Sequence, residues 1–274
     1  MAHDESQSVL RFEHVTVRFF EATALDDISF EVTSGETRVI FGAAGSGKTV
    51  LLKTALGLIK PDSGEVRVFG QALSGMEETD LFRIRSRIGV LFQEGGLFDS
   101  LTVEENVAYP LENIAEAQLP PDEVRARASE ALRFVELEQT LDKFPAELSG
   151  GMRRRVGIAR AIVTEPPLML YDSPTAGLDP ITAFTIIDLI AKERDLKNTT
   201  TVMATHRYQD GHFLATCRFD QQTGRAEPVA EAEENGLGTV FMVLNQGRIA
   251  FEGSLAEFNA SADPYVAKFV RHEE

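Results

Sequence analysis

The sequence GAAGSGKT at residues 42–49 decides the fold, because it matches the phosphate-binding pattern G-x-x-x-x-G-K-[ST] at every position. It follows the apolar run Thr37–Phe41 and precedes a stretch of helical character at residues 50–56. In a strand–loop–helix unit, successive backbone N–H groups and a helix N-terminus point at one anion. Lys48 would neutralise the β- and γ-phosphates, and the Thr49 hydroxyl would bind Mg²⁺. The motif therefore predicts a nucleoside triphosphate site.

Strands and helices alternate on both sides of this motif. Period-two alternation and short apolar runs predict strands at residues 10–19, 28–32, 88–92 and 199–204. Helical spacing predicts helices at residues 122–138 and 180–194. This order predicts an α/β fold with a mostly parallel sheet, interrupted by a helical insertion. The acidic segment at residues 218–238 is expected to form a mobile surface loop.

Composition excludes some function classes. A formal net charge of −16 over 274 residues argues against wrapping nucleic acid, which requires a basic surface. The single cysteine, Cys217, excludes an internal disulfide and favours a reducing compartment. No apolar run approaches the roughly 18 residues that span a bilayer. Any work at a membrane would therefore go through a partner.

Two further stretches have the residue types of a nucleotide site. Leu168–Asp172 is an apolar run that ends in a carboxylate, which would reach the Mg²⁺ shell or instead cap a helix. LSGGM at residues 148–152 places a serine and two glycines at a helix start, which is either a second anion site or an ordinary cap. Neither stretch decides between its two readings by itself.

Taken together and in this order, these motifs resemble the ATP-binding cassette (ABC) ATPases. The similarity rests on the phosphate loop, Gln93, residues 148–152, Leu168–Asp172, residues 177–180 and His206. It implies a P-loop NTPase (RecA-like) core with a mostly parallel sheet, an N-terminal antiparallel β subdomain and an inserted α-helical subdomain. Residues 1–274 would then form a single ABC ATPase domain. Its expected parts are a helical subdomain at 94–163, a long surface insertion at 207–238 and a C-terminal helical extension at 254–274.

The resemblance also implies a set of site residues. It implies a dimer that binds two ATP molecules at its interface, each held by the phosphate loop of one subunit and by residues 149–151 of the other. The expected nucleotide-binding residues are Phe19, Gly42, Ala43, Ala44, Gly45, Ser46, Gly47, Lys48, Thr49, Val50, Ser149, Gly150 and Gly151. The expected catalytic residues are Gln93, Asp172 and His206, and the expected Mg²⁺ ligands are Thr49, Gln93 and Asp172.

Within that set, each side chain has an expected role. Gln93 would touch Mg²⁺ and sense a transmembrane partner, and His206 would contact the γ-phosphate. Phe19 stands where the family usually places an aromatic ring that stacks on adenine, and Phe20 is the neighbouring candidate. Phe19 would otherwise be an ordinary strand residue that points into the core.

One position departs from the family pattern. The family places Glu directly after the Asp that ends the second apolar run, whereas this chain has Ser173. A serine hydroxyl orients water but does not accept its proton at neutral pH, and general-base assistance is worth about 10²–10⁴ in rate. We therefore expect ATP-driven dimerisation with slow hydrolysis, or hydrolysis assisted by His206 and a neighbouring carboxylate. A degenerate site in a heterodimer and an engineered trap are the alternatives.

The branch of the family is indicated by residues 91–111, which resemble the ATPase subunits of Mla-type phospholipid transporters. This resemblance implies an ATPase that drives a permease and moves phospholipid or another lipid. The alternatives are the ATPase of a polar-solute importer, since such importers share parts of the Gln93 segment, and a nucleotide-gated scaffold that hydrolyses almost nothing.

The same resemblance implies cofactors, partners and a location. The cofactors are ATP and Mg²⁺. The expected partners are transmembrane permease subunits, a second copy of this chain or a related ATPase subunit, and a small regulatory subunit, with no nucleic acid. The expected location is the cytoplasmic face of the inner (plasma) membrane, peripheral through the permease. Residues 263–270 predict a short helix docked by Tyr265, Val266 and Phe269, for dimerisation or for plain core packing.

Overall fold

A computed structural model describes residues 8–93, 95–113, 119–230 and 237–271. The parts of the expected helical subdomain, surface insertion and C-terminal extension that fall on residues 94, 114–118, 231–236 and 272–274 lie outside the described residues.

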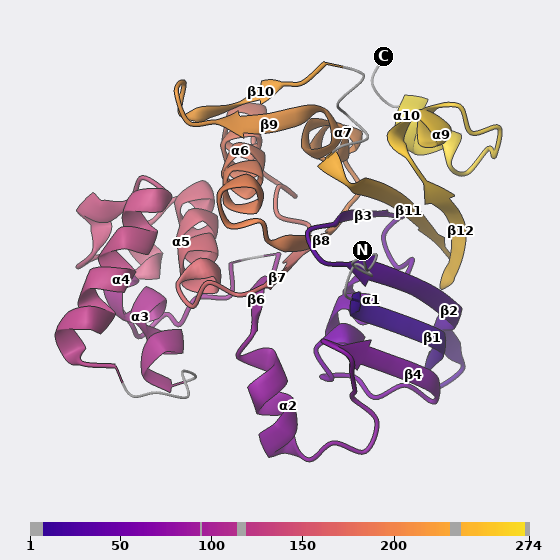
Figure 1. The fold of residues 1–274 in the computed structure, drawn as a ribbon, viewed down its shortest axis with the longest axis horizontal. Helices are drawn as coiled ribbons and strands as arrows, with labels where there is room; N and C mark the ends of the chain where they lie inside the picture. The colour runs from indigo at the N-terminus through magenta and orange to yellow at the C-terminus, as the bar shows by residue number, and fades with distance from the viewer. Residues whose placement is uncertain (1–7, 94, 114–118, 231–236, 272–274) are drawn as a thin grey trace, which may run out of the picture.

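The centre of the fold is a six-stranded sheet in the order β12-β11-β3-β8-β7-β6 (Figure 1). Its strands are β3 (Thr37–Phe41), β6 (Ile88–Leu91), β7 (Leu168–Asp172), β8 (Thr200–Thr205), β11 (Thr239–Asn245) and β12 (Arg248–Gly253). All neighbouring strands pair in parallel except β11 and β12, which are antiparallel. The carboxyl ends of the parallel strands therefore meet at one edge of the sheet.

Apolar side chains cover both faces of this sheet. All five residues of β3 are buried. Val39 and Phe41 belong to the apolar cluster on one face, whereas Ile40 belongs to the cluster on the other. Such a strand reads in sequence as an unbroken apolar run, because neither face meets water.

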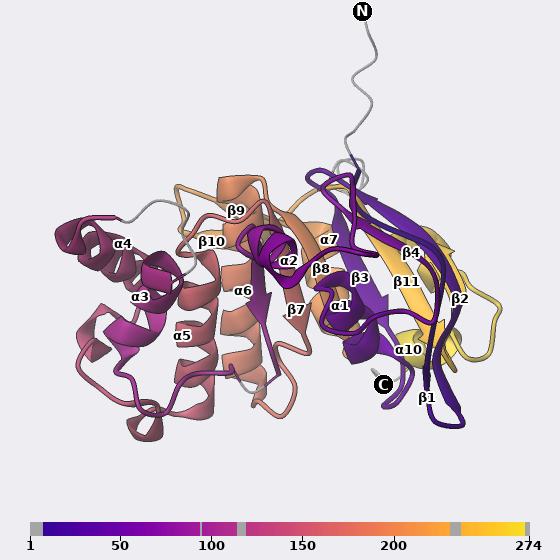
Figure 2. The ribbon, with the colours of Figure 1, turned by 90° about the horizontal axis from the view of Figure 1, so that it is seen from below.

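A second sheet, antiparallel and four-stranded, lies beside the first in the order β2-β1-β4-β5. Its strands are β1 (Ser8–Phe19), β2 (Ala22–Thr33), β4 (Ser63–Val68) and β5 (Gln71–Ala72). Helix α1 (Lys48–Ala55) lies between the two sheets (Figure 2). Leu51 and Leu52 of α1 are buried in the same cluster as Leu10 of β1 and Leu170 of β7.

Helices form the opposite end of the molecule (Figure 2). They are α3 (Val103–Asn113), α4 (Pro121–Phe134) and α5 (Gly150–Ile162), with short 3₁₀ turns at Glu138–Thr140 and Pro145–Glu147. Helix α2 (Glu78–Arg85) lies apart from them, beside β6. Helices α3, α4 and α5 contact one another, and α5 also packs on β6 and on α6 (Pro180–Lys197). The α/β fold class is confirmed, with its antiparallel N-terminal part and its helical insertion. The residue limits of these parts stay predictions.

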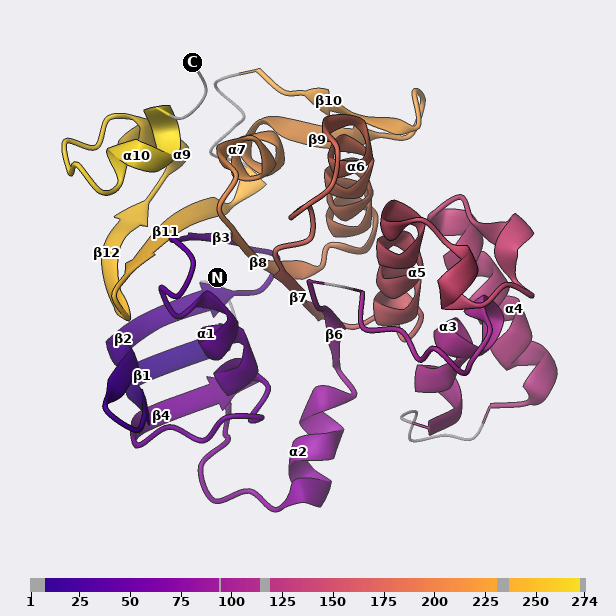
Figure 3. The same ribbon diagram turned by 180° about the vertical axis from the view of Figure 1, so that it is seen from behind.

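The segment at residues 218–238 differs from the expected loop. It contains a two-stranded antiparallel hairpin, β9 (Cys217–Asp220) and β10 (Arg225–Pro228), which follows α7 (Tyr208–Thr216) and lies along α6 (Figure 3). The loop prediction was wrong for these strands, because four-residue strands carry little periodic signal and the acidic composition outweighed it.

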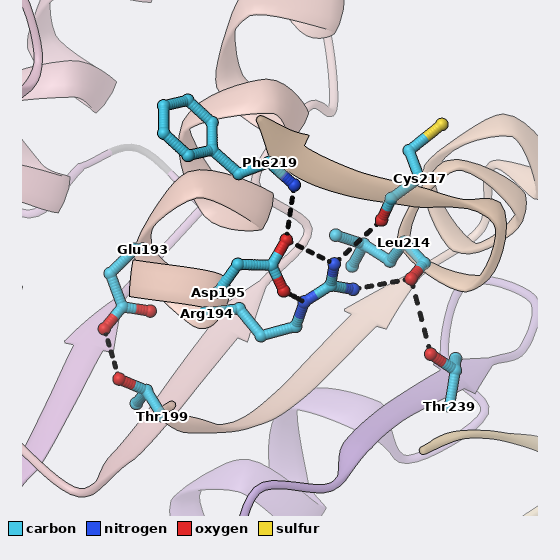
Figure 4. Close-up of polar contacts among 8 residues, drawn as sticks. All are labelled: Glu193, Arg194, Asp195, Thr199, Leu214, Cys217, Phe219 and Thr239. Atoms are coloured by element: carbon cyan, nitrogen blue, oxygen red, sulfur yellow. Dashed lines mark hydrogen bonds and ion pairs between the residues drawn. The ribbon is translucent and has the colours of Figure 1, made fainter. Parts of the chain in front are cut away.

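Two adjacent side chains of α6 hold this hairpin (Figure 4). Arg194 is almost fully buried and donates to the carbonyls of Leu214 at 2.5 Å and Cys217 at 2.8 Å. Asp195 forms an ion pair with Arg194 at 2.7 Å and accepts the Phe219 backbone N–H at 2.7 Å. The carboxylate of Asp195 thus neutralises the buried guanidinium and also holds β9. This pairing offsets the unfavourable free energy of burying a charge.

The C-terminal segment packs against the core sheet. It contains the short helices α9 (Leu255–Asn259) and α10 (Ala267–Arg271). Phe258 and Val266 are fully buried, and Tyr265 and Phe269 pack against the same cluster. Within the described ranges, no helix has the length and apolar character needed to cross a membrane.

We expect a titrating carboxyl on α6 to make stability depend on pH. Glu193 is 2% exposed and accepts the Thr199 hydroxyl at 2.6 Å, and burial raises its pKa from the usual 4.5 to about 7. Between these values the folded chain binds a proton that the unfolded chain has released. The free energy of unfolding should therefore fall as pH rises from 4.5 to 7, by at most about 1.4 kcal/mol per pH unit.

Urea unfolding of Glu193→Gln between pH 4 and 8 checks this expectation, because the variant should lose that part of the pH dependence. Glu165→Gln is the matched control, since the neighbouring Lys197 lowers the pKa of Glu165. An unchanged pH slope in Glu193→Gln would contradict the assignment.

Candidate nucleotide-binding site

The phosphate loop leaves the carboxyl end of β3 and enters α1. Its turn closes through the Ser46 N–H, which donates to the Ala43 carbonyl at 3.1 Å, and α1 begins with Leu51 N–H donating to the Gly47 carbonyl at 2.8 Å. The loop borders a cavity of about 630 Å³. The cavity is lined by Ala24, Ala43, Ala44, Gly45, Ser46, Gly47, Lys48, Thr49, Val50, Gln93, Ser173, Ala176 and His206. The structure thus brings residues 43–50, Gln93 and His206 together from three separate parts of the chain, whereas the predicted Gly42 and Asp172 are not part of this lining.

Two glycines are required by close backbone approaches. Gly47 has a φ of +108°, and a Cβ there would lie 2.5 Å from the Ala24 carbonyl oxygen. A Cβ on Gly42 would lie 2.2 Å from the Ser46 hydroxyl and 2.8 Å from the Leu244 carbonyl oxygen. The first and second glycines of the motif are therefore needed for packing as well as for an open approach to the phosphates.

The ammonium group of Lys48 is held by the loop itself. Its Nζ donates to the carbonyls of Gly42 at 2.6 Å and Ala43 at 3.0 Å. Burial lowers the pKa of Lys48, and the charge of Asp172 opposes that shift. The group is positioned at the mouth of the loop, where phosphate oxygens would replace the carbonyls as its partners.

Oxygen atoms suited to Mg²⁺ meet beside the lysine. Asp172 ends β7 and is 6% exposed, and its Oδ2 accepts the Thr49 hydroxyl at 2.8 Å. Gln93 lines the same cavity. Mg²⁺ prefers carboxylate, hydroxyl and amide oxygens of this kind. Thr49 and Gln93 line one cavity and Asp172 is hydrogen-bonded to Thr49, so the three predicted ligands fit the ion by their chemistry.

Ser173 occupies the cavity wall next to Asp172. Its backbone has a φ of +52°, its N–H donates to the Ala204 carbonyl at 2.8 Å, and its hydroxyl donates to Asp172 Oδ1 at 3.3 Å. A backbone bond to β8 therefore holds the position against the sheet, while the side chain offers a hydroxyl where a carboxylate was expected.

The segment that carries Gln93 is held by helix α5. Arg154 is almost fully buried and donates to the Gln93 carbonyl at 3.0 Å and to the Ala176 carbonyl. Arg160, about two turns further on, donates to the Gly96 carbonyl at 2.8 Å. Helix α5 is thus attached to two segments that line the cavity, those of Gln93 and Ala176. The position of Arg154 in a run of arginines did not indicate this role.

A buried carboxylate, also missed from the sequence, joins two of the loops. Asp210 of α7 is 3% exposed and accepts the hydroxyls of Thr175 and, at 2.9 Å, Thr205. Burial raises the pKa of Asp210, and the two threonines oppose the shift. Thr205 precedes His206 and Thr175 lies two residues after Ser173, so Asp210 connects the loops that carry them. Its place four residues after His206 was the only sequence signal.

Some predicted site residues lie elsewhere. Ser149 caps α5 by accepting the Met152 N–H at 3.2 Å, and Gly150 borders a separate cleft of about 650 Å³ that Gln93 also lines. Phe19 and Phe20 lie at the β1–β2 turn, 44% exposed and fully exposed. The cavity lining described above includes neither these aromatics nor residues 149–151. Their roles toward the nucleotide stay predictions.

The chain is similar in sequence to several known proteins. A family model described as "ABC transporter" matches residues 25–176. The methionine import ATP-binding protein MetN of Carboxydothermus hydrogenoformans is 41% identical over 183 residues, covering 67% of this chain and 53% of that protein. MetN 1 of Shouchella clausii is 34% identical over 268 residues, covering 96% of this chain and 70% of that protein. The chain spans just over half the length of several such relatives.

Solved structures agree with the fold. A dimeric structure of a post-hydrolysis state of the ATP-binding cassette MJ0796, bound to ADP and Pi, has a TM-score of 0.74 and 30% identity. The similarity covers 90% of this chain and 99% of that one. CbiO1 from Clostridium perfringens, part of a cbiONQ transporter complex, has a TM-score of 0.73 at 26% identity and covers 96% of this chain and 94% of that one.

Gly45 and Gly47 provide a matched test of the loop geometry. Both have positive φ, but a Cβ on Gly45 meets nothing within 4 Å. We expect Gly45→Ala to lower the free energy of unfolding by about 1–2 kcal/mol from backbone strain alone. Gly47→Ala should cost a further ~1–3 kcal/mol from the contact with Ala24. Urea unfolding of both variants checks this, and equal losses would contradict the close approach at Gly47.

Proposed function

The chain belongs to the ABC transporter family, and we propose that it is the ATP-binding and ATP-hydrolysing subunit of an ABC transporter. One observation carries the proposal: the phosphate loop, Gln93 and His206 border a single cavity, and Asp172 is hydrogen-bonded to Thr49 of that loop. Backbone N–H groups of the loop and the N-terminus of α1 would bind the phosphates. His206 would donate a hydrogen bond to a γ-phosphate oxygen.

Mg²⁺ would be held by Thr49, Gln93 and Asp172, and it would neutralise charge on the phosphates. Lys48 would exchange its carbonyl partners for phosphate oxygens and add a second positive charge. The Thr49–Asp172 hydrogen bond of 2.8 Å keeps these two ligands within reach of one ion. The chain thus supplies both the cradle and the counter-charge for a triphosphate.

We further propose that two copies of this chain close around two ATP molecules. Residues 149–151 have the composition of an anion site at a helix start, yet they lie outside the phosphate-loop cavity of their own chain. A second copy would bring them to it. The dimeric form of MJ0796, a structural neighbour, supports this arrangement. Closure driven by γ-phosphate contacts would bias a transmembrane permease between two states.

Hydrolysis depends on what acts as the base. Ser173 supplies a hydroxyl at the cavity wall, so turnover would be slow or would rely on His206 with a neighbouring carboxylate. The second candidate function, a nucleotide-gated subunit that hydrolyses almost nothing, is favoured by this one residue. In that case binding and release of ATP alone would open and close the dimer.

For the transported molecule, we propose a polar solute taken up by an importer. The MetN relatives support this reading over lipid transport, because their names state methionine import. The resemblance of residues 91–111 to Mla-type subunits is the remaining argument for a lipid. With a permease as partner, the chain would lie on the cytoplasmic face of the plasma membrane, and a small regulatory subunit would be a further partner.

ATP turnover tests the proposal. We expect native chain to bind Mg-ATP and to turn over slowly, Lys48→Ala to be inactive, and Ser173→Glu to be about 10²–10⁴ times faster because it restores a base. The position already has positive φ, so the substitution adds no new backbone strain.

The outcomes separate the two candidates. Measurable turnover by native chain, abolished in Lys48→Ala, supports the transport ATPase with another group as base. Turnover in Ser173→Glu alone supports the nucleotide-gated subunit. Failure of native chain to bind Mg-ATP would overturn both.

A further inference from the structure

The C-terminal segment reaches the phosphate loop through one hydroxyl. Tyr265, which lies between α9 and α10, accepts the Ala43 backbone N–H at 3.2 Å and donates to the Leu244 carbonyl at 3.2 Å. A phenol has one proton to donate and lone pairs to accept, so both bonds are made at once. Tyr265 therefore joins the start of the phosphate loop to the end of β11.

The peptide unit that Tyr265 holds is the one that holds Lys48. The Ala43 N–H and the Gly42 carbonyl belong to the same peptide group, which is planar and trans. The N–H is bound by Tyr265, and the carbonyl accepts Lys48 Nζ at 2.6 Å. The N–H and the C=O lie in one plane and point in opposite directions. Fixing the N–H therefore also fixes the direction of the carbonyl.

Tyr265 is itself held firmly. Its backbone N–H donates to Asp263 Oδ1 at 2.7 Å, and its ring meets Phe269 edge-to-face at 5.5 Å. The ring centroid of Phe269 lies 5.9 Å from that of Phe41, the last residue of β3. The adjacent Val266 is fully buried. The hydroxyl is thus presented from a packed element that also supports the strand leading into the loop.

We propose that Tyr265 is a positioning residue of the phosphate loop, which orients the Gly42–Ala43 peptide and through it Lys48. This inference rests on the proposed ATP binding. It makes docking of residues 254–271 and binding of the triphosphate mutually reinforcing, since a coupling between two events is reciprocal. The C-terminal segment then acts on nucleotide affinity without touching the nucleotide.

The test compares two phenylalanine substitutions. Tyr265→Phe removes the hydroxyl and keeps the ring. Tyr208→Phe is the matched control, because the Tyr208 hydroxyl donates to Asn259 of the same C-terminal segment at 2.9 Å. Calorimetric titration with Mg-ATP gives Kd, and thermal unfolding with and without Mg-ATP gives Tm.

We expect Tyr265→Phe to raise the Kd for Mg-ATP about two- to tenfold, the range for one hydrogen bond, and to reduce the Tm rise that Mg-ATP produces. Tyr208→Phe should leave the Kd unchanged, with a Tm in the absence of nucleotide close to that of Tyr265→Phe. Equal Kd values for native chain and Tyr265→Phe would overturn the inference, as would an equal loss in Tyr208→Phe. If native chain itself does not bind Mg-ATP, the proposed function fails and the inference fails with it.

Discussion

The parallel pairing of β3 between β8 and β11 is the constraint on which the rest of the structure depends. With both faces buried, β3 has no freedom to shift, so the chain leaves it at one fixed point and turns through a glycine-rich loop into α1. Because β7 and β8 run the same way, Asp172 and the segment that carries His206 emerge at the same edge. Ligand sites of open α/β sheets form at this edge for that reason.

Around that edge, a few polar groups connect segments that are far apart in sequence. Arg154 attaches α5 to the Gln93 segment, Asp210 joins the two loops that follow β7 and β8, and Tyr265 holds the first peptide of the phosphate loop. Arg154 and Asp210 are buried, where losing a hydrogen-bond partner is costly, whereas Tyr265 is half-buried. Movement of the helical insertion, of His206 or of the C-terminal segment would therefore shift residues at the phosphate-loop cavity.

The departures from expectation have local physical causes. The hairpin at β9 and β10 was expected to be a loop, because its strands are short and owe their position to Arg194 and Asp195 rather than to a periodic pattern. The resemblance to lipid transporters rested chiefly on one short segment, residues 91–111. The longer similarity to methionine importers includes the core and outweighs it.

The sequence by itself determined the α/β class, the strand–loop–helix unit and the residue types that predict a phosphate and Mg²⁺ site. These depend on short-range features: an apolar run, glycines at defined spacing, and a lysine and threonine at a helix start. It also identified Ser173 at the position where the family pattern has Glu. Only the tertiary structure decided which residues share one cavity, that residues 149–151 lie outside it, and that Arg154, Asp210 and Tyr265 hold its walls. Those facts depend on contacts between residues more than twenty positions apart, which no local pattern encodes because the partners meet only when the sheet forms.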